Sequence, residues 1–75
     1  MPYIKIKAYP KDPAVKQRVA ERINQVFLEE WGCSPAAICI SIEEVPPEKW
    51  DAQVRKPEIE TNLSKMMILD GRKQY

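Results

Sequence analysis

The sequence predicts an α+β protein built on one βαβ unit: two parallel strands, one long helix and a short C-terminal helix. Apolar residues alternate over residues 3–9 and again over residues 38–42, which is the pattern of a strand. Between these two segments, apolar residues recur at helical spacing. A strand, a helix and a strand of these lengths form a right-handed unit whose two strands run parallel.

The first expected strand spans residues 3–9. One face carries Ile4, Ile6 and Ala8, and the other carries Tyr3, Lys5, Lys7 and Tyr9. Pro10 follows and breaks the alternation.

The long helix is expected to begin after Asp12 and to end at Gly32, a length of about 19 residues. Asp12 suits the N-cap position, and Pro13 suits the first helical position. Gly32 provides a C-terminal stop. Its apolar stripe consists of Val15, Val19, Ile23, Val26, Phe27 and Trp31.

The second strand is expected around Ile38, Ile40 and Ile42, which alternate with Cys39, Ser41 and Glu43. Residues 45–50 contain two prolines and form a rigid turn. Pro57 is expected to open the C-terminal helix, because proline fits the first helical position. The stripe of that helix would be Ile59, Leu63, Met66 and Met67, with Gly71 near its end.

The chain length predicts a single domain, residues 1–75, that assembles with copies of itself. A chain this short buries only about 60% of its unfolded surface. Two parallel strands are also too few for independent stability, and each leaves an unpaired edge. We therefore expect a sheet extended across subunits in a homo-oligomer, with a dimer favoured over a hexamer.

Composition excludes several classes of function. Twelve basic and eleven acidic residues give a net charge of +1, so the sequence lacks the excess of positive charge typical of nucleic-acid-binding proteins. Two cysteines and no histidine make a zinc site or a disulfide scaffold unexpected, and two glycines form no phosphate loop. No run of about 18 apolar residues occurs, so we expect no membrane span. The expectation is a cytoplasmic protein with reduced thiols, no cofactor and no metal.

With no histidine for a Ser-His or Cys-His pair, acid–base chemistry falls to carboxylates, lysines, a cysteine or the chain terminus. Among these, the terminus stands out. Pro2 is small enough to allow removal of Met1, which would expose a secondary amine. An α-amino group titrates near about 7.7–8.0, and burial or nearby cations lower that pKa. Such an amine is neutral at cellular pH, as a general base must be. The alternative is that Pro2 is merely a proline tolerated at the start of a strand.

The segment Pro2-Tyr3-Ile4-Lys5-Ile6-Lys7 resembles the opening strand of the 4-oxalocrotonate tautomerase family. The helix of about 19 residues, the strand at residues 38–42 and the aromatic residue Trp50 recur at that family's spacing. The turn at residues 46–50 and the C-terminal helix resemble the small dimeric branch from enterobacteria. The classical hexameric branch ends in a β-hairpin instead.

The resemblance implies a cofactor-independent tautomerase acting on a small 2-oxo acid or its enol. Pro2 matches the family's catalytic base, and Trp50 matches the aromatic wall of the pocket. Lys11 lies near the position of an arginine that holds the substrate carboxylate. A second family arginine falls at or beside Cys39 and is absent here. This departure disfavours a dicarboxylate substrate and suits a monocarboxylate with an aromatic tail, such as phenylenolpyruvate.

Other interpretations stay open at this stage. The chain could be a non-catalytic βαβ oligomerisation or interaction module that keeps the fold without activity, or a decarboxylase or hydratase-dehalogenase of the same superfamily. Trp50 could be a packing residue, and Cys39 a small apolar residue of the sheet. If Met1 is retained, the Pro2 nitrogen is an amide and has no basicity. If Lys11 does not hold the carboxylate, Arg55 or Arg72 is the next candidate.

Overall fold

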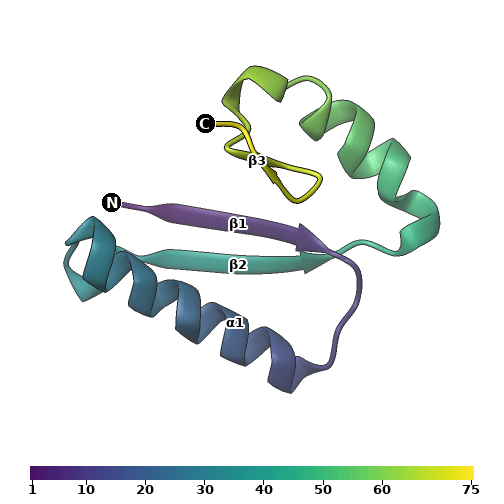
Figure 1. The fold of residues 1–75 in the computed structure, drawn as a ribbon. Helices are drawn as coiled ribbons and strands as arrows, with labels where there is room; N and C mark the ends of the chain where they lie inside the picture. The colour runs from purple at the N-terminus through teal and green to yellow at the C-terminus, as the bar shows by residue number, and fades with distance from the viewer.

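The computed structural model describes all residues 1–75, and Figure 1 shows their arrangement. The regular elements are two longer strands, one long helix, several short helical segments and a small hairpin. In chain order they are β1 (Tyr3–Ala8), α1 (Pro13–Val26), η1 (Phe27–Trp31), η2 (Pro35–Ala37), β2 (Cys39–Glu44), η3 (Pro47–Lys49), η4 (Asp51–Ile59), η5 (Leu63–Lys65), β3 (Ile68–Leu69) and β4 (Arg72–Lys73).

Strands β1 and β2 form a parallel pair, as the sequence predicts. Tyr3 lies opposite Cys39 at one end, and Ala8 lies opposite Glu44 at the other. One backbone hydrogen bond extends the ladder at its far end, where the Val45 N–H donates to the Ala8 carbonyl at 2.9 Å. The α+β architecture with a central βαβ unit is therefore confirmed.

The long helix also has the predicted extent. The Asp12 side chain accepts a hydrogen bond from the Ala14 N–H at 3.1 Å, and Pro13 occupies the first turn. The helix continues past Val26 as the wider π-helical turn η1 and ends at Gly32, whose φ of 70° is left-handed. Glycine adopts that conformation without the steric cost that a Cβ would impose.

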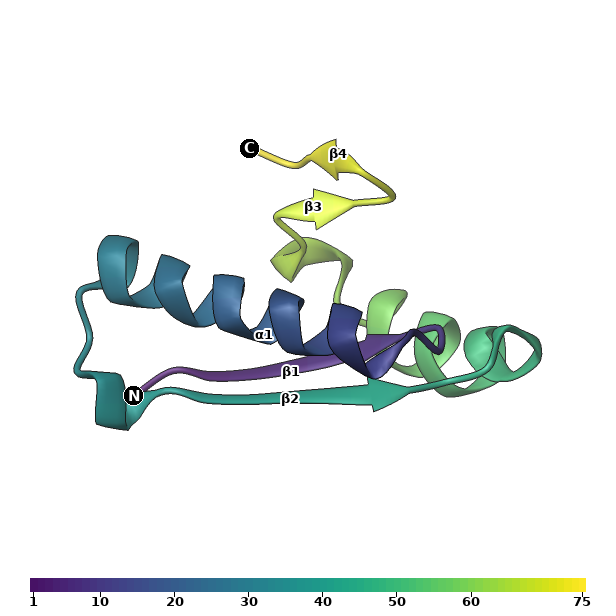
Figure 2. The ribbon, with the colours of Figure 1, turned by 90° about the horizontal axis from the view of Figure 1, so that it is seen from below.

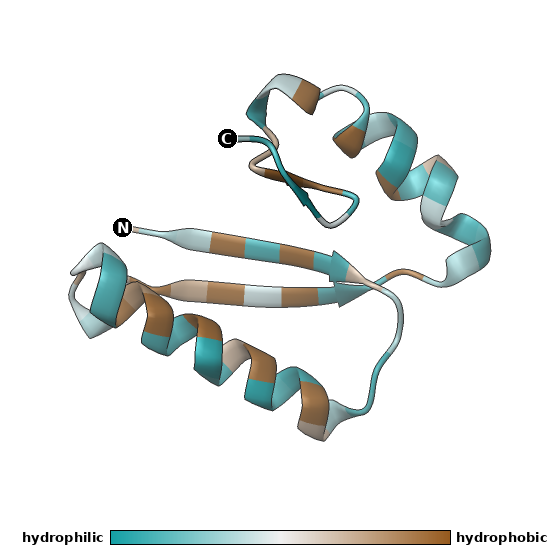
Figure 3. Cartoon of the chain, viewed as in Figure 1, coloured by the Kyte–Doolittle hydropathy of each residue, from teal (hydrophilic) through white to brown (hydrophobic).

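Helix α1 covers one face of the two-stranded sheet. Its apolar side chains Val15 and Val19 share a hollow with Ile6 and Ile42 of the strands. Figure 3 shows the alternation of apolar and polar residues along both strands and the recurring apolar residues along α1. On the opposite sheet face, Lys5 and Lys7 share a hollow with Val54 and Glu58 of η4, and Lys7 pairs with Glu58.

The bounds predicted for the C-terminal helix are wrong. The helix η4 runs over Asp51–Ile59 and contains Pro57 in its interior. Its turns are wide, as shown by the Glu60 N–H, which donates to the carbonyl of Arg55 five residues earlier at 2.9 Å. Proline normally disrupts the tighter i→i−4 pattern, which is why Pro57 suggested a start rather than a middle.

The residues expected to extend that helix form a β-hairpin instead. Strands β3 and β4 pair antiparallel, with Leu69 opposite Arg72. The two residues between them, Asp70 and Gly71, have φ angles of 49° and 81°. Two positive φ angles are what a type I′ hairpin turn requires, and Asp-Gly is a favoured pair for it. Gly71 thus belongs to a turn and does not end a helix. The chain ends in a β-hairpin, the feature expected of the hexameric branch, so its C-terminal structure does not support a dimer over a hexamer.

A single chain buries few of its side chains completely and leaves ten large apolar residues exposed. Only Val45 and Val54 are buried. The accessible surface is 6086 Å², against about 4,700 Å² for a compact protein of this mass. The radius of gyration is 13.8 Å, whereas about 11 Å is typical of a compact chain of this length. Figure 2 shows the β3–β4 hairpin standing clear of the sheet.

None of the helices is both long and apolar enough to span a bilayer.

Candidate functional site

The four side chains singled out by the sequence lie in two groups at opposite ends of the β1–β2 sheet. Pro2 and Cys39 are at the end where both strands begin, and the Cys39 N–H donates to the Pro2 carbonyl at 3.1 Å. Lys11 and Trp50 are at the end where the strands finish, beside Tyr9. The six residues of β1 that separate the groups span about 20 Å. One chain therefore does not bring all four residues together.

At the first end, Pro2 directly precedes β1 and is half-buried. Its carbonyl is held by the hydrogen bond from Cys39, whereas its nitrogen takes no part in the ladder. Cys39 is an exposed free thiol in β2. Tyr3, on the same sheet face as Cys39, is 68% exposed. This end of the sheet therefore presents an open face next to Pro2.

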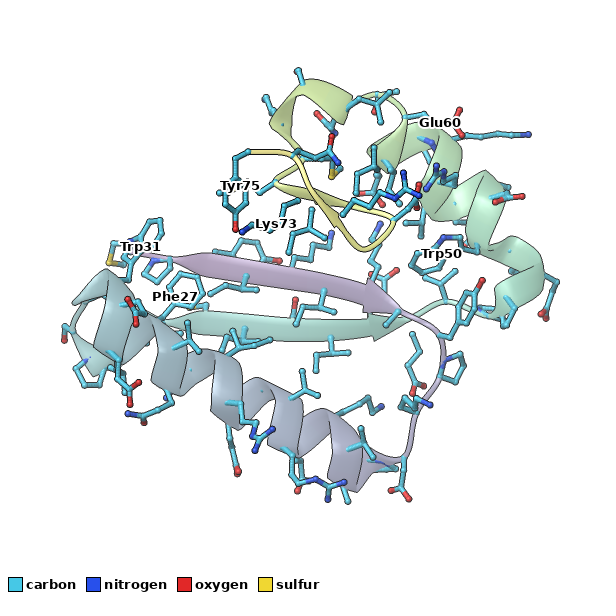
Figure 4. The ribbon with its side chains drawn as sticks, viewed as in Figure 1. Phe27, Trp31, Trp50, Glu60, Lys73 and Tyr75 are labelled. Carbon is cyan, nitrogen blue, oxygen red and sulfur yellow. The ribbon has the colours of Figure 1, made fainter.

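At the second end, Trp50 packs edge-on against Tyr9. The two ring centroids lie 5.1 Å apart and the ring planes are inclined by 84°. These two residues line a shallow hollow of about 410 Å³ together with Lys7, Ala8 and Lys11. The position of Trp50 beside the end of β1 is visible in Figure 4. The hollow combines an aromatic wall with two lysines, which suits a ligand with a ring and a negative charge.

The two lysines of this hollow differ in their partners. Lys7 Nζ pairs with Glu58, and the hydrogen bond to that carboxylate raises the pKa of Lys7. The Lys11 ammonium makes no ion pair. The free cation in the hollow is thus Lys11.

The backbone of Lys11 is held by Glu44, a residue that the sequence did not single out. The Lys11 N–H donates to Glu44 Oε2 at 3.0 Å, and Lys16 Nζ lies 3.0 Å from the same oxygen. Both contacts lower the pKa of Glu44, and the hydrogen bond from the Lys11 backbone N–H has the larger effect.

Tyr9 was missed as well, because its contact with Trp50 joins residues about forty positions apart. No local signal in the sequence pointed to either contact.

The alternative carboxylate partner Arg55 is already engaged. Its guanidinium donates to both carboxylate oxygens of Asp70, at 2.8 Å and 3.2 Å, and lies 3.8 Å from a Glu60 oxygen. The hydrogen bond to Asp70 raises the pKa of Arg55 and lowers that of Asp70. Arg55 therefore ties η4 to the turn of the hairpin. Arg72 lies in β4, within the same hairpin.

The structure contains no group of three or more His, Cys, Asp or Glu side chains arranged to hold a metal ion.

Comparison with known proteins gives a consistent match. The family model described as "Tautomerase enzyme" matches residues 2–58. A protein named "Tautomerase PptA" from Cronobacter sakazakii is 29% identical over 73 residues, covering 95% of this chain and 96% of the relative. A "Probable tautomerase" from Xylella fastidiosa is 31% identical over 72 residues, covering 95% of this chain and 88% of the relative. The "Tautomerase PptA" of an Escherichia coli O127:H6 strain is 31% identical over 71 residues, covering 87% and 93%.

Proposed function

The chain belongs to the tautomerase family of isomerases and resembles its enterobacterial branch. From this premise we propose that Pro2 is the base that interconverts an enol and its 2-oxo acid. The observation that carries the proposal is the position of Pro2. The Pro2 carbonyl is fixed by its hydrogen bond in the β1–β2 ladder, whereas the Pro2 nitrogen takes no part in the ladder. The proline ring can therefore be held in one orientation while its nitrogen remains available for proton transfer.

The chemistry requires that Met1 be removed. The Pro2 nitrogen then becomes a secondary amine, and partial burial disfavours its charged form. The neutral amine takes the proton from the enol oxygen as the carbonyl forms. The protonated Pro2 amine then delivers a proton to the neighbouring carbon, which completes the 2-oxo acid and returns the amine to its neutral form. The net change is a proton moved from oxygen to carbon, with no oxidation and no leaving group.

The second half of the site comes from another copy of the chain. A two-fold partner whose strands run the opposite way would bring its hollow, with Trp50 and Lys11, towards Pro2. The chain has about 1,400 Å² more surface than a compact protein of its mass, which exceeds the roughly 800 Å² per partner of an ordinary interface. We propose a homodimer on this basis.

The residues of the hollow favour a monocarboxylate with an aromatic tail. Lys11 offers one unpaired positive charge in the hollow. The position at or beside Cys39, where the family resemblance places a second arginine, carries a neutral thiol instead. Trp50 and Tyr9 provide an aromatic wall for the tail. Phenylenolpyruvate has both features. Both cysteines are free thiols, which fits the reducing cytoplasm that we propose as the compartment.

Ketonisation of phenylenolpyruvate, followed by its absorbance, tests the proposal. The processed chain, whose intact mass lacks Met1, should accelerate the reaction. A chain with an uncleavable extension before Pro2 should lose nearly all of that activity, because its Pro2 nitrogen is an amide. Equal rates from the two chains would contradict the proposed base. No turnover by either chain would favour a non-catalytic oligomerisation module.

A further inference from the structure

We propose that Glu44 is a positioning residue that fixes Lys11 for carboxylate binding, and that Lys16 serves this site by balancing the charge of Glu44. The inference rests on the proposed function, because it assumes that Lys11 holds the substrate carboxylate. Neither Glu44 nor Lys16 needs to touch the substrate.

The geometry shows how the segment around Lys11 is held. Before Lys11, the Ala8 carbonyl accepts a hydrogen bond from the Val45 N–H at 2.9 Å. At Lys11, the backbone N–H donates to Glu44 Oε2 at 3.0 Å. After it, the Asp12 side chain caps α1. The hydrogen bond to Glu44 is the one that Lys11 itself donates, and a hydrogen bond to an ionised acceptor is stronger than one to a neutral acceptor.

The charges show why Lys16 is part of the arrangement. A lone carboxylate beside Lys11 would repel the carboxylate of a substrate and cancel much of the attraction from Lys11. Lys16 Nζ lies 3.0 Å from the same Glu44 oxygen, so the charges of Glu44 and Lys16 largely offset one another. Lys11 then remains the effective charge of the hollow. Glu44 is ionised at neutral pH, as an ordinary glutamate is, and its contacts with Lys11 and Lys16 lower its pKa further.

The arrangement contributes little to the stability of the fold. The side chains of Lys16 and Glu44 are 30% and 36% exposed, and exposed ion pairs stabilise proteins weakly. A purely structural ion pair would therefore leave the kinetics unchanged when it is removed. A positioning role changes substrate affinity while the fold is retained.

The test compares steady-state kinetics with phenylenolpyruvate for single variants. Glu44→Ala removes the acceptor of the Lys11 N–H and should raise KM by about three- to tenfold with little change in kcat. Glu44→Gln keeps an acceptor oxygen and should restore most of the affinity. Lys16→Met leaves the Glu44 charge unbalanced and should also raise KM. Glu30→Ala removes an exposed carboxylate that makes no ion pair and should behave as the wild type.

Parallel measurements on Lys11→Ala separate this inference from the proposed function. If Lys11→Ala raises KM and Glu44→Ala does not, Glu44 has no positioning role and the tautomerase proposal stands. If neither variant changes KM, Lys11 is not the carboxylate partner and the inference fails with it. If the wild-type chain shows no turnover, binding of cinnamate, followed by tryptophan fluorescence, gives the same comparison. Equal affinity of the wild type and Glu44→Ala for cinnamate would also overturn the inference.

Discussion

Pro2 and Trp50 lie at opposite ends of the same pair of parallel strands. Pro2 is bound to Cys39 where the strands begin, and Trp50 packs against Tyr9 just past the end of β1. Trp50 lines hollows with Lys5, Lys7 and Lys11, and neither hollow includes Pro2. The proposed dimer supplies the second copy of the chain, whose Trp50 would complete the site at Pro2.

Mixing two chains that are each impaired at a different half of the site tests this shared site. One chain carries an uncleavable extension before Pro2, and the other carries Trp50→Ala. In a hybrid dimer, Pro2 of the second chain meets the intact Trp50 of the first chain. After dissociation and reassembly of an equal mixture, activity should reach about one quarter of the wild-type value, because half of the dimers are hybrids with one intact site.

Sedimentation of the same mixture provides the control, since the hybrid requires a stable dimer at micromolar concentration. Activity no higher than the mean of the two parents would contradict a shared site. A monomer would contradict the oligomer itself. A hexamer would keep the mechanism and change only the assembly.

The elements that could be predicted from the sequence are those with a local sequence pattern. The long helix formed by α1 and η1 has a start signal in Asp12 and Pro13 and a stop signal in Gly32, and its apolar period is regular. The strands likewise follow from alternation alone. The hairpin signal Asp70-Gly71 was also local, but the expected helix from Pro57 obscured it, because wide turns that tolerate an internal proline are uncommon.

The contacts that shape the candidate site were not predictable in this way. The pairs Tyr9–Trp50 and Lys11–Glu44 join residues more than thirty positions apart. Each pair forms only because the βαβ unit brings the end of β1 beside the end of β2 and the segment that follows it. Hydrophobic periodicity and capping residues report on contacts within one helix or strand. They carry no information on contacts between elements that are distant in the sequence. The family resemblance identified Trp50 and Lys11 as candidate site residues. It did not identify Tyr9 and Glu44, which contact them.

Trp50 is expected to affect the basicity of Pro2 as well as the rate. As a wall of the shared pocket, it excludes water from the amine, so Trp50→Ala should let the amine pKa rise towards that of a free terminus. The pH profile of kcat/KM should therefore shift to higher pH while the rate falls. Trp50→Phe preserves an aromatic wall and should keep the wild-type profile. An unchanged profile for Trp50→Ala would reduce Trp50 to a packing residue.

The hairpin should loosen in acid through the Arg55–Asp70 pair. The folded-state pKa of Asp70 lies below its ordinary value of 3.8, so the pair contributes fully above that pH and is lost as the pH falls further. Asp70→Asn removes the charge at every pH. In that variant, exchange of the Gln74 N–H, which donates to the Met67 carbonyl at 2.8 Å, should be faster at neutral pH.

Glu60→Gln is the matched control for this variant, because Glu60 lies 3.8 Å from Arg55 and belongs to no hairpin strand. Its exchange rates should follow the wild type. If Asp70→Asn leaves the Gln74 exchange rate unchanged, the hairpin is held by its own turn and strands and not by Arg55.

The most direct prediction concerns Pro2→Ala. After removal of Met1, alanine leaves a primary amine in the place of the proline nitrogen, without the ring that restricts its orientation. Activity should fall substantially, because the base is both differently basic and less well oriented. The carbonyl of residue 2 still accepts from the Cys39 N–H, so the strand ladder is unaffected. The thermal midpoint and the oligomer should therefore match the wild type, since a terminal residue contributes little to packing. Loss of activity together with a lower midpoint would assign residue 2 a structural role, and full activity would exclude it as the base.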